Sequence, residues 1–297
     1  MSTLTNTQKV TSVAAAVTAA LAGYTTAQAQ LEEIVVTATK KSESLQDIAG
    51  SVQALTEDTL KKANVIGMED YAKLIPSMSY VNYTPGTGKV YFRGIADDNG
   101  TFIAEESSAL YLNEQPVTQS GMAVDVRMID VARIEALAGP QGTLYGSSAQ
   151  SGAIRIITNK PDTSEFSALG DVTLKTMGEG GSSYDFSGVI NVPITDNFAI
   201  RAVGFTAEDG GFVDVVDGNS ARFGIVNNST FNPSAVRDDV NTFNSSGGRI
   251  AGQWDMDDGY YLVELATQQN SADGYSYFDP SVGDLQRVSF YDEPRDD

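Results

Sequence analysis

The stretch "GPQGTLYGSSAQSGAIRIIT", residues 139–158, joins a glycine-rich half to an apolar half that is typical of a buried strand. A phosphate-binding loop would instead follow a strand, open a helix and, in its commonest form, carry Gly-Lys-Ser/Thr. Here Gly146 is followed by Ser147 and Ser148, no lysine is present, and a strand comes next. The glycines therefore indicate tight turns and close backbone packing rather than nucleotide binding.

Around this stretch, residues 42–160 mix short strands with short helices. Thr56 can cap a helix whose first turn is acidic, as the helix dipole favours. A second helix is predicted from Met68 to Ile75, where Pro76 stops it. The pattern predicts an α+β domain with one core. Extended stretches are predicted at Val52–Leu55, Lys89–Ile95, Ala109–Leu112, Val131–Leu137 and Gly152–Thr158.

From about residue 164 the pattern changes to two-residue alternation of apolar and polar side chains. Tight turns alternate with a long polar connection over residues 208–245, and aromatic residues flank the tight turns, which is typical of an outer-membrane β-barrel. A soluble antiparallel sheet with one wet face produces the same alternation and stays the alternative. The alternating segments are Asp171–Thr176, Tyr184–Val192, Phe198–Thr206, Gly248–Trp254 and Tyr261–Gln268.

Residues 1–29 have the pattern of an export signal. A positive start at Lys9 precedes an apolar run over residues 10–23, and Ala27-Gln28-Ala29 is a small-residue cleavage site. The run is too short to cross a bilayer, which needs about 20 apolar residues. We expect an exported chain that begins near Gln30.

Composition excludes several function classes. The chain of 297 residues has 39 acidic and 19 basic side chains and a net charge of −20, which disfavours binding to nucleic acid. Cys and His are both absent, so Ser-His-Asp and Cys-His nucleophiles and the commonest transition-metal ligands are missing. We expect no enzyme, no catalytic residues, no metal site and no cofactor.

The stretch "LEEIVVTATKK", residues 31–41, is rich in strand formers, yet no neighbouring stretch is an evident pairing partner. An unpaired strand is a hazard that proteins normally cover.

Three more motifs stand between these features: "YFRGI" (91–95), "ALYLNEQPV" (109–117) and "VARIEAL" (131–137). In this order and spacing, the motifs resemble the N-terminal part of a TonB-dependent outer-membrane receptor. The resemblance implies a signal peptide (1–29), a TonB box and linker (30–41), an α+β plug domain (42–160) and the first antiparallel strands of an outer-membrane β-barrel (161–297). The plug motif comprises Gly94, Gly139, Pro140, Gln141, Gly142, Tyr145, Gly146 and Gly152.

In such receptors a plug gates a barrel of roughly 22 strands and admits a scarce nutrient, most commonly a ferric siderophore, across the outer membrane. The resemblance implies that the periplasmic partner TonB binds the TonB box by adding a strand to its sheet. The alternative is that residues 34–36 form the first strand of the plug itself. The implied TonB box is Glu32, Glu33, Ile34, Val35, Val36, Thr37 and Ala38.

The chain departs from the family pattern at Ala138, where members usually carry Arg. That Arg resembles a partner of Arg93, which is expected to lock the plug to glutamates of the barrel. With one cation fewer we predict a looser plug or a compensating residue elsewhere, because buried charge clusters are sensitive to the loss of a member.

The length is the second departure. The residues after 160 suffice for about five or six membrane strands. An open sheet in lipid would leave unsatisfied backbone groups at its edges, so we expect a partial sequence of a longer receptor.

Candidate ligand contacts are Asp97, Asp98 and Asn99, which follow the "RG" motif in a loop that faces the extracellular side in the family. A solvated turn is the alternative, since these are ordinary turn residues. For the whole protein, the alternative to a receptor in outer-membrane lipid is a secreted or periplasmic binding module.

Overall fold

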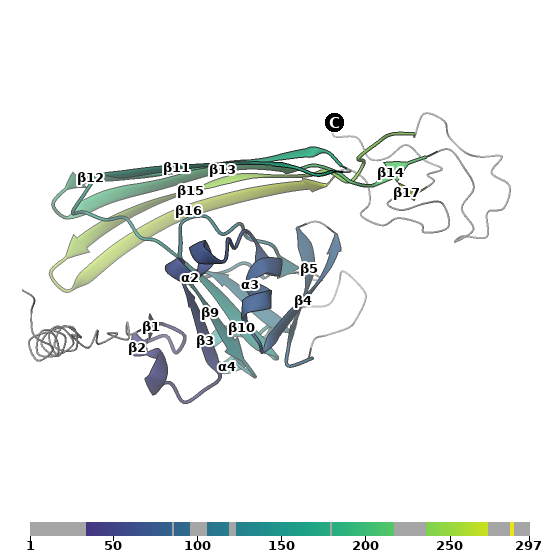
Figure 1. Cartoon of the computed structure of the whole chain (residues 1–297). Helices are drawn as coiled ribbons and strands as arrows, with labels where there is room; N and C mark the ends of the chain where they lie inside the picture. Colours follow the sequence, from purple (N-terminus) through teal and green to yellow (C-terminus); the bar gives the residue numbers. More distant parts are fainter. Residues whose placement is uncertain are drawn as a thin grey trace, which may run out of the picture. The chain divides into compact units, whose positions relative to one another are not determined.

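The computed structural model describes residues 34–84, 86–95, 106–118, 123–178, 180–216, 236–272 and 286–287. The predicted export signal lies outside these residues. Two five-stranded sheets dominate the described chain (Figure 1). The first belongs to an α+β domain, and the second, which we call the long sheet, follows it in sequence.

The sheet of the α+β domain has the strand order β3-β9-β10-β6-β7. The neighbours β9 and β10 are antiparallel, whereas β10 and β6 are parallel. The glycine-rich stretch supplies β10 and the single-turn helix α4 (Gly142–Tyr145) before it. The strands are β3 (Val52–Thr56), β6 (Ser108–Leu112), β7 (Gln115–Pro116), β9 (Val131–Ala138) and β10 (Gly152–Thr158).

Both predicted helices are present. Helix α2 (Glu57–Lys62) begins where the Thr56 hydroxyl accepts the backbone N–H of Thr59 at 3.4 Å. Helix α3 (Met68–Leu74) ends immediately before Ile75, as Pro76 predicts. A smaller sheet with the order β4-β5-β8 completes the domain. Its strands are β4 (Met78–Thr84), β5 (Thr87–Phe92) and β8 (Ala123–Val124).

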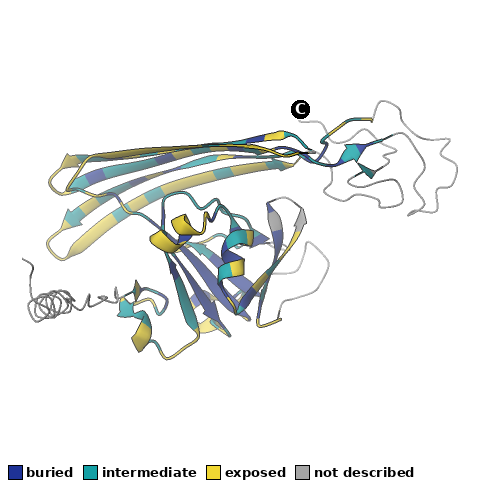
Figure 2. Cartoon of the chain, in the orientation of Figure 1, coloured by how far each residue is buried: buried dark blue, intermediate teal, exposed yellow. Residues whose placement is uncertain are grey.

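The hydrophobic core lies on one face of the five-stranded sheet, under the two helices and β4-β5 (Figure 2). Gly152 is required there, because a Cβ atom at this position would lie 2.4 Å from Cδ2 of Phe92. This is the close packing that the glycine spacing predicts. Each fully buried large apolar side chain contributes about 1.5–3 kcal/mol to folding. The core includes Leu60, Met68, Tyr71, Phe92, Ile134, Ile154 and Ile156.

The long sheet is an antiparallel meander with the order β11-β12-β13-β15-β16. Its two-residue turns at 196–197 and 257–258 confirm the predicted tight turns. The longest strands have 14 residues, about 45 Å at the usual rise, which exceeds the roughly 25 Å apolar band of a membrane barrel. The strands are β11 (Ser167–Thr176), β12 (Ser182–Thr195), β13 (Phe198–Asp209), β15 (Phe243–Met256) and β16 (Gly259–Ala272).

One face of the long sheet is apolar and open to solvent. The cross-strand register aligns its side chains in rows, such as Ile190, Ala202, Ile250 and Leu265. A soluble sheet would bury this face, so the exposure favours the barrel interpretation. Among the described residues, no helix is long and apolar enough to cross a membrane. The exposed large side chains of this face include Val172, Leu174, Phe186, Ile190, Ile250, Trp254, Tyr261, Val263 and Leu265.

Candidate functional site

The N-terminal segment Val35–Ala38, which we call the docked segment, is held by the α+β domain. Its strand β1 (Val35–Val36) pairs with β2 (Glu43–Ser44) in an antiparallel two-residue ladder. Val36 and Ala38 are fully buried, whereas Val35 is 48% exposed. The expectation of a strand without a nearby partner is therefore wrong, because β1 pairs with β2 in a separate two-stranded sheet. The assignment of these residues to a TonB box stays a prediction. Glu32 and Glu33 lie outside the described residues.

Thr37 is bound by two buried charges on the sheet face opposite the hydrophobic core. Oε1 of Glu135 accepts the backbone N–H of Thr37 at 2.8 Å, and Nη1 of Arg155 donates to the Thr37 hydroxyl at 2.8 Å. Both charged side chains are fully buried. A backbone group and a hydroxyl of the docked segment thus bond to both members of an internal ion pair.

Further charges extend this pair into a network that we call the inner ion cluster: Glu114, Arg133, Glu135 and Arg155. Nε of Arg133 donates to Oε1 of Glu135 at 2.8 Å. Glu114 pairs with Arg155 and also accepts Nζ of Lys40 at 2.5 Å. The charges of the cluster alternate in sign, so the two fully buried members, Glu135 and Arg155, each have partners of opposite charge.

Ala38 is held by a separate contact. The Tyr145 hydroxyl of α4 donates to the Ala38 carbonyl at 2.6 Å. Burial raises the pKa of Tyr145 to about 12, so the hydroxyl keeps the proton that it donates. The plug-motif tyrosine therefore has a defined role in the structure: it fixes the end of the docked segment.

A second ion cluster, which we call the clamp, joins the α+β domain to the long sheet. It comprises Asp130, directly before β9, together with Arg201 of β13 and Arg249 of β15. Nε of Arg201 donates to Oδ2 of Asp130 at 2.7 Å, and Arg249 bonds to the same carboxylate. The Asp130 side chain is 3% exposed. A carboxylate of the α+β domain is thus enclosed by two cations of the long sheet.

Neighbouring groups extend the clamp to β16. Nη1 of Arg249 bonds to Oε2 of Glu264 at 3.3 Å. Oε1 of Glu264 accepts Nδ2 of Asn113 at 2.8 Å, and Thr158, the last residue of β10, donates to Oε2 at 3.4 Å. The ends of β9 and β10 that lie away from the docked segment are therefore both tied to the long sheet.

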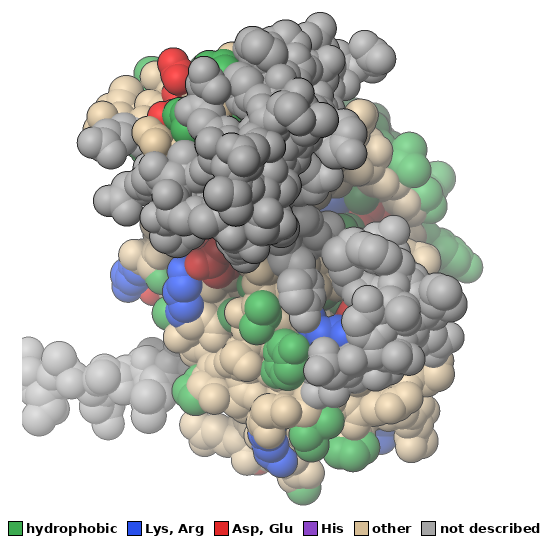
Figure 3. Space-filling view, turned by 90° about the vertical axis from the view of Figure 1, so that its right-hand side faces the viewer, with side chains coloured by type: hydrophobic (Ala, Val, Ile, Leu, Met, Phe, Trp, Pro, Cys, Tyr) green, Lys and Arg blue, Asp and Glu red, His purple; other side chains and the backbone are tan. Residues whose placement is uncertain are grey.

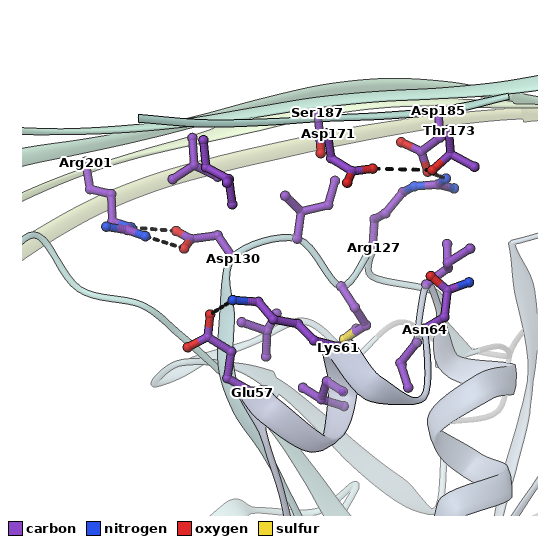
Figure 4. Close-up of a pocket in the computed structure, with 18 of the residues that line it drawn as sticks. Glu57, Lys61, Asn64, Arg127, Asp130, Asp171, Thr173, Asp185, Ser187 and Arg201 are labelled. Atoms are coloured by element: carbon purple, nitrogen blue, oxygen red, sulfur yellow. Dashed lines mark hydrogen bonds and ion pairs between the residues drawn. The ribbon is translucent and has the colours of Figure 1, made fainter. Parts of the chain in front are cut away.

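The segment between β8 and β9 adds two more links. The Gln268 side chain donates to the Asp125 carbonyl at 2.7 Å and accepts the Arg127 N–H at 3.2 Å, which imitates strand pairing. The Arg127 guanidinium pairs with Asp185 of β12. Figure 4 shows Arg127 and Asp130 reaching toward the long sheet across a cavity of about 660 Å³.

The predicted locking residue lies elsewhere. Arg93 and Gly94 form an exposed turn with positive φ angles of 52° and 77°, and the structure shows no ion pair for Arg93 within the described residues. Ala138 is buried on the core face of β9. Arg155 lies on the opposite face of the sheet, so it does not occupy the place of the missing family arginine. Locking by Arg93 stays a prediction.

The remaining predicted residues lie as follows. Gly139 and Gln141 lie in the turn that follows β9, which backbone hydrogen bonds hold against residues 149–151. The Gly139 N–H donates to the Ser151 carbonyl and the Gln141 N–H donates to the Ala149 carbonyl, both at 2.8 Å. Gly146, with φ of 81°, ends α4. Pro140 lies in the same turn, and Gly142 is the first residue of α4. Asp97, Asp98 and Asn99 lie outside the described residues.

Sequence reasoning missed the inner ion cluster and the clamp. A signal was available: Glu135 and Arg155 interrupt strands that are otherwise apolar, and a charge at a buried strand position requires a partner. Arg201 and Arg249 likewise occupy the polar side of alternating strands. Their partners come from residues far away in the sequence, which is why the pairing was not visible.

The surface seen in Figure 3 carries Lys and Arg side chains that are scattered rather than gathered. The described side chains on this face therefore form no basic patch of the kind that binds nucleic acid. Within the described ranges, no three carboxylates lie close enough together to hold a metal ion.

The chain is similar in sequence to known proteins over part of its length. The sequence pattern of the TonB-dependent Receptor Plug Domain matches residues 44–153. The pesticin receptor of Yersinia pestis is 32% identical over 149 residues, which are 48% of this chain and 21% of that receptor. The vitamin B12 transporter BtuB of Vibrio vulnificus is 26% identical over 141 residues, 46% of this chain and 22% of the transporter. The chain thus spans about a fifth of the length of these curated relatives.

A solved structure extends the likeness beyond the α+β domain. The ferripyoverdine receptor of the outer membrane of Pseudomonas aeruginosa superposes with a TM-score of 0.61 and 18% identity, over 82% of this chain and 29% of that receptor. At this identity the likeness shows the fold. The coverage includes strands of the long sheet as well as the α+β domain, since the α+β domain alone is shorter than the matched share.

Proposed function

We propose that this chain serves active import across the outer membrane, because the TonB-dependent Receptor Plug Domain pattern matches residues 44–153 and antiparallel strands of the kind that build an outer-membrane β-barrel follow it. The matched relatives are named as receptors and transporters, not as enzymes. The protein binds a scarce nutrient from outside, most simply a ferric siderophore, and the plug gates its entry. The periplasmic partner TonB drives the gate by pairing with residues 32–38.

One observation carries the proposal. The α+β domain is tied by the clamp to one face of the long sheet, while the opposite face of that sheet exposes rows of apolar side chains. A polar, occupied inner face and an apolar outer face are what a plugged barrel in lipid requires. A soluble binding module would have to cover the apolar face with protein.

Localisation tests the membrane part of the proposal. Cells that express the complete gene are fractionated, and the outer membranes are washed with urea. A receptor stays in the outer-membrane pellet, whereas a product released into the soluble fraction would leave the binding-module alternative in place.

Growth under iron limitation tests the substrate. A deletion strain carrying the gene is supplied with single ferric siderophores, and with cobalamin in a cobalamin-dependent strain. Gene-dependent growth on one siderophore supports the iron assignment. Growth rescued by cobalamin alone would show that the substrate is a cobalamin, as the name of the vitamin B12 transporter BtuB states for that relative, and not a ferric siderophore.

Val35→Pro tests the role of the docked segment in transport. Proline removes a backbone N–H that strand addition needs, so we expect uptake to be lost while ligand binding at the cell surface persists. Val35→Thr is the matched control, because threonine keeps the N–H and the strand propensity. Unimpaired uptake in the proline variant would show that residues 32–38 do not bind TonB by strand addition.

A further inference from the structure

We propose that Glu135 and Tyr145 form a latch that holds the docked segment. Strands β9 and β10 stay attached to the long sheet when the latch opens. A pull on the N-terminus then frees Val35–Ala38 while the clamp stays closed. The inference rests on the proposed function, because it assigns the residues that regulate access to the TonB-binding segment. Glu135 acts as a positioning residue, since it holds the segment and does not itself contact TonB.

The latch combines a few hydrogen bonds with one buried apolar side chain. The docked segment is bonded through the Thr37 N–H to Glu135, the Thr37 hydroxyl to Arg155, and the Ala38 carbonyl to Tyr145. Val36, fully buried, adds the apolar contact. The Thr37 hydroxyl also donates to Oε1 of Glu135 at 3.3 Å and accepts Nη2 of Arg133 at 3.2 Å. Five hydrogen bonds and one buried valine side chain thus hold the segment to the sheet and to α4.

Opening the latch leaves no charge unpaired. Glu135 and Arg155 bond directly to each other at 2.7 Å, and Arg133 and Glu114 stay attached to them. When the segment leaves, water replaces Thr37 around an ion pair that remains intact. The large penalty of stranding a buried charge is therefore absent, and the segment can leave without disrupting the sheet.

The clamp is built differently. Asp130 directly precedes β9, the strand that carries Glu135. Its carboxylate is enclosed by the guanidinium groups of Arg201 and Arg249. Separating the α+β domain from the long sheet would break both arginine pairs of Asp130 at once, together with the side-chain bonds of Glu264 and Gln268, which is more than opening the latch breaks. Strands β9 and β10 are thus held at one end by the stronger cluster and carry the weaker latch along their length, so a pull opens the latch first.

A buried thiol measures the latch directly. The 297 residues contain no cysteine, and Val36→Cys places a small apolar side chain where the parent residue is fully buried. In the intact receptor purified in detergent, a hydrophilic maleimide reacts with this thiol only when the segment is released, so the labelling rate follows the open population. Receptor without the introduced cysteine gives the background.

Two substitutions weaken the latch without adding or removing charge. Thr37→Val removes the hydroxyl contacts and keeps the shape, and Tyr145→Phe removes the bond to the Ala38 carbonyl. Tyr145→Phe should raise the labelling rate about fivefold, the factor for one hydrogen bond of about 1 kcal/mol. Thr37→Val should raise it at least as much, because it removes three hydroxyl contacts. Glu135→Leu combined with Arg155→Met removes the polar anchor while keeping the buried site apolar, and should raise labelling further.

Asp130→Asn is the matched control, because it weakens the clamp at the start of β9 and leaves the latch residues unchanged. It should leave labelling at residue 36 unchanged within about twofold. Unchanged labelling in both Thr37→Val and Tyr145→Phe would overturn the latch. Labelling that rises in Asp130→Asn as much as in Tyr145→Phe would overturn the order of release, since latch and clamp would then open together.

Failure of the proposed function is read from a different measurement. A peptide of residues 30–41 is titrated with the soluble C-terminal domain of TonB. Absence of binding would refute the partner while the labelling series still decides the latch, and binding with an unresponsive thiol would refute the latch while the partner stands.

Discussion

Arg155 and Glu135 face each other across the antiparallel strands β10 and β9, and their side chains form a 2.7 Å ion pair with no exposed surface. The pair lies on the sheet face opposite the hydrophobic core. There it is covered by Thr37 of the docked segment, which supplies a donor to one partner and an acceptor to the other. The segment that is proposed to bind TonB therefore also completes the interior of the domain.

Arg155→Met should destabilise the α+β domain by about 3–5 kcal/mol, because it leaves Glu135 charged and buried with fewer partners. Adding Glu135→Leu to this variant should recover most of the loss, since an apolar pair of similar volume is tolerated. Calorimetry of the detergent-purified receptor measures both. A double variant that is less stable than the single one would show that the pair is needed for more than mutual neutralisation.

Gly152→Ala should lower stability by about 1–3 kcal/mol, the range for overpacking a core, because the new Cβ would meet Phe92 at 2.4 Å. Gly142→Ala is the control: a Cβ there meets nothing within 4 Å, and alanine favours the first turn of α4. Thermal midpoints of the two variants should separate clearly. Equal midpoints would argue against close packing at residue 152.

Asp125 should make stability depend on pH. Its carboxylate accepts the Met68 N–H at 2.7 Å, and burial raises its pKa from 3.8 to about 6. Between these values the folded chain binds a proton that the unfolded chain does not, so this group's contribution falls as pH rises from about 4 to 6. Its destabilising effect is complete above pH 6 and absent below the unfolded pKa.

Asp125→Asn removes this titration and keeps an oxygen that can accept the same N–H. The stability gained by the variant relative to the parent should therefore be larger at pH 7 than at pH 4.5. Asp58→Asn, at a side chain that is 72% exposed, is the control and should show little difference. A gain for Asp125→Asn that is the same at both pH values would contradict the shifted pKa.

Leu265→Arg tests which face of the long sheet meets lipid. Leu265 belongs to the exposed apolar rows, and an arginine on the lipid face near the bilayer centre costs about 2–4 kcal/mol. We expect less protein in the outer membrane, measured by immunoblotting of washed membranes. Ala266→Arg, one residue along and therefore on the other face, should reduce the yield much less. The reverse order would invert the assignment of the faces.

Much of the molecule was determined by the sequence through local rules. Thr56, the acidic turn after it and Pro76 mark the ends of two short helices, because capping groups and proline act on their immediate neighbours. Two-residue alternation predicted the five strands of the long sheet and their tight turns. The spaced glycines of residues 139–158 predicted tight turns and close packing, and the structure shows the close packing at Gly152.

Only the tertiary structure decided how the charges pair. Glu135, Arg155, Asp130, Arg201 and Arg249 find partners across strands or across two sheets, and sequence spacing does not encode those distances. For the same reason, the strand formers at residues 34–36 could be recognised, but not their place on the domain. Strand propensity is a property of a few neighbouring residues, whereas the docking of that strand depends on a carboxylate about a hundred residues away.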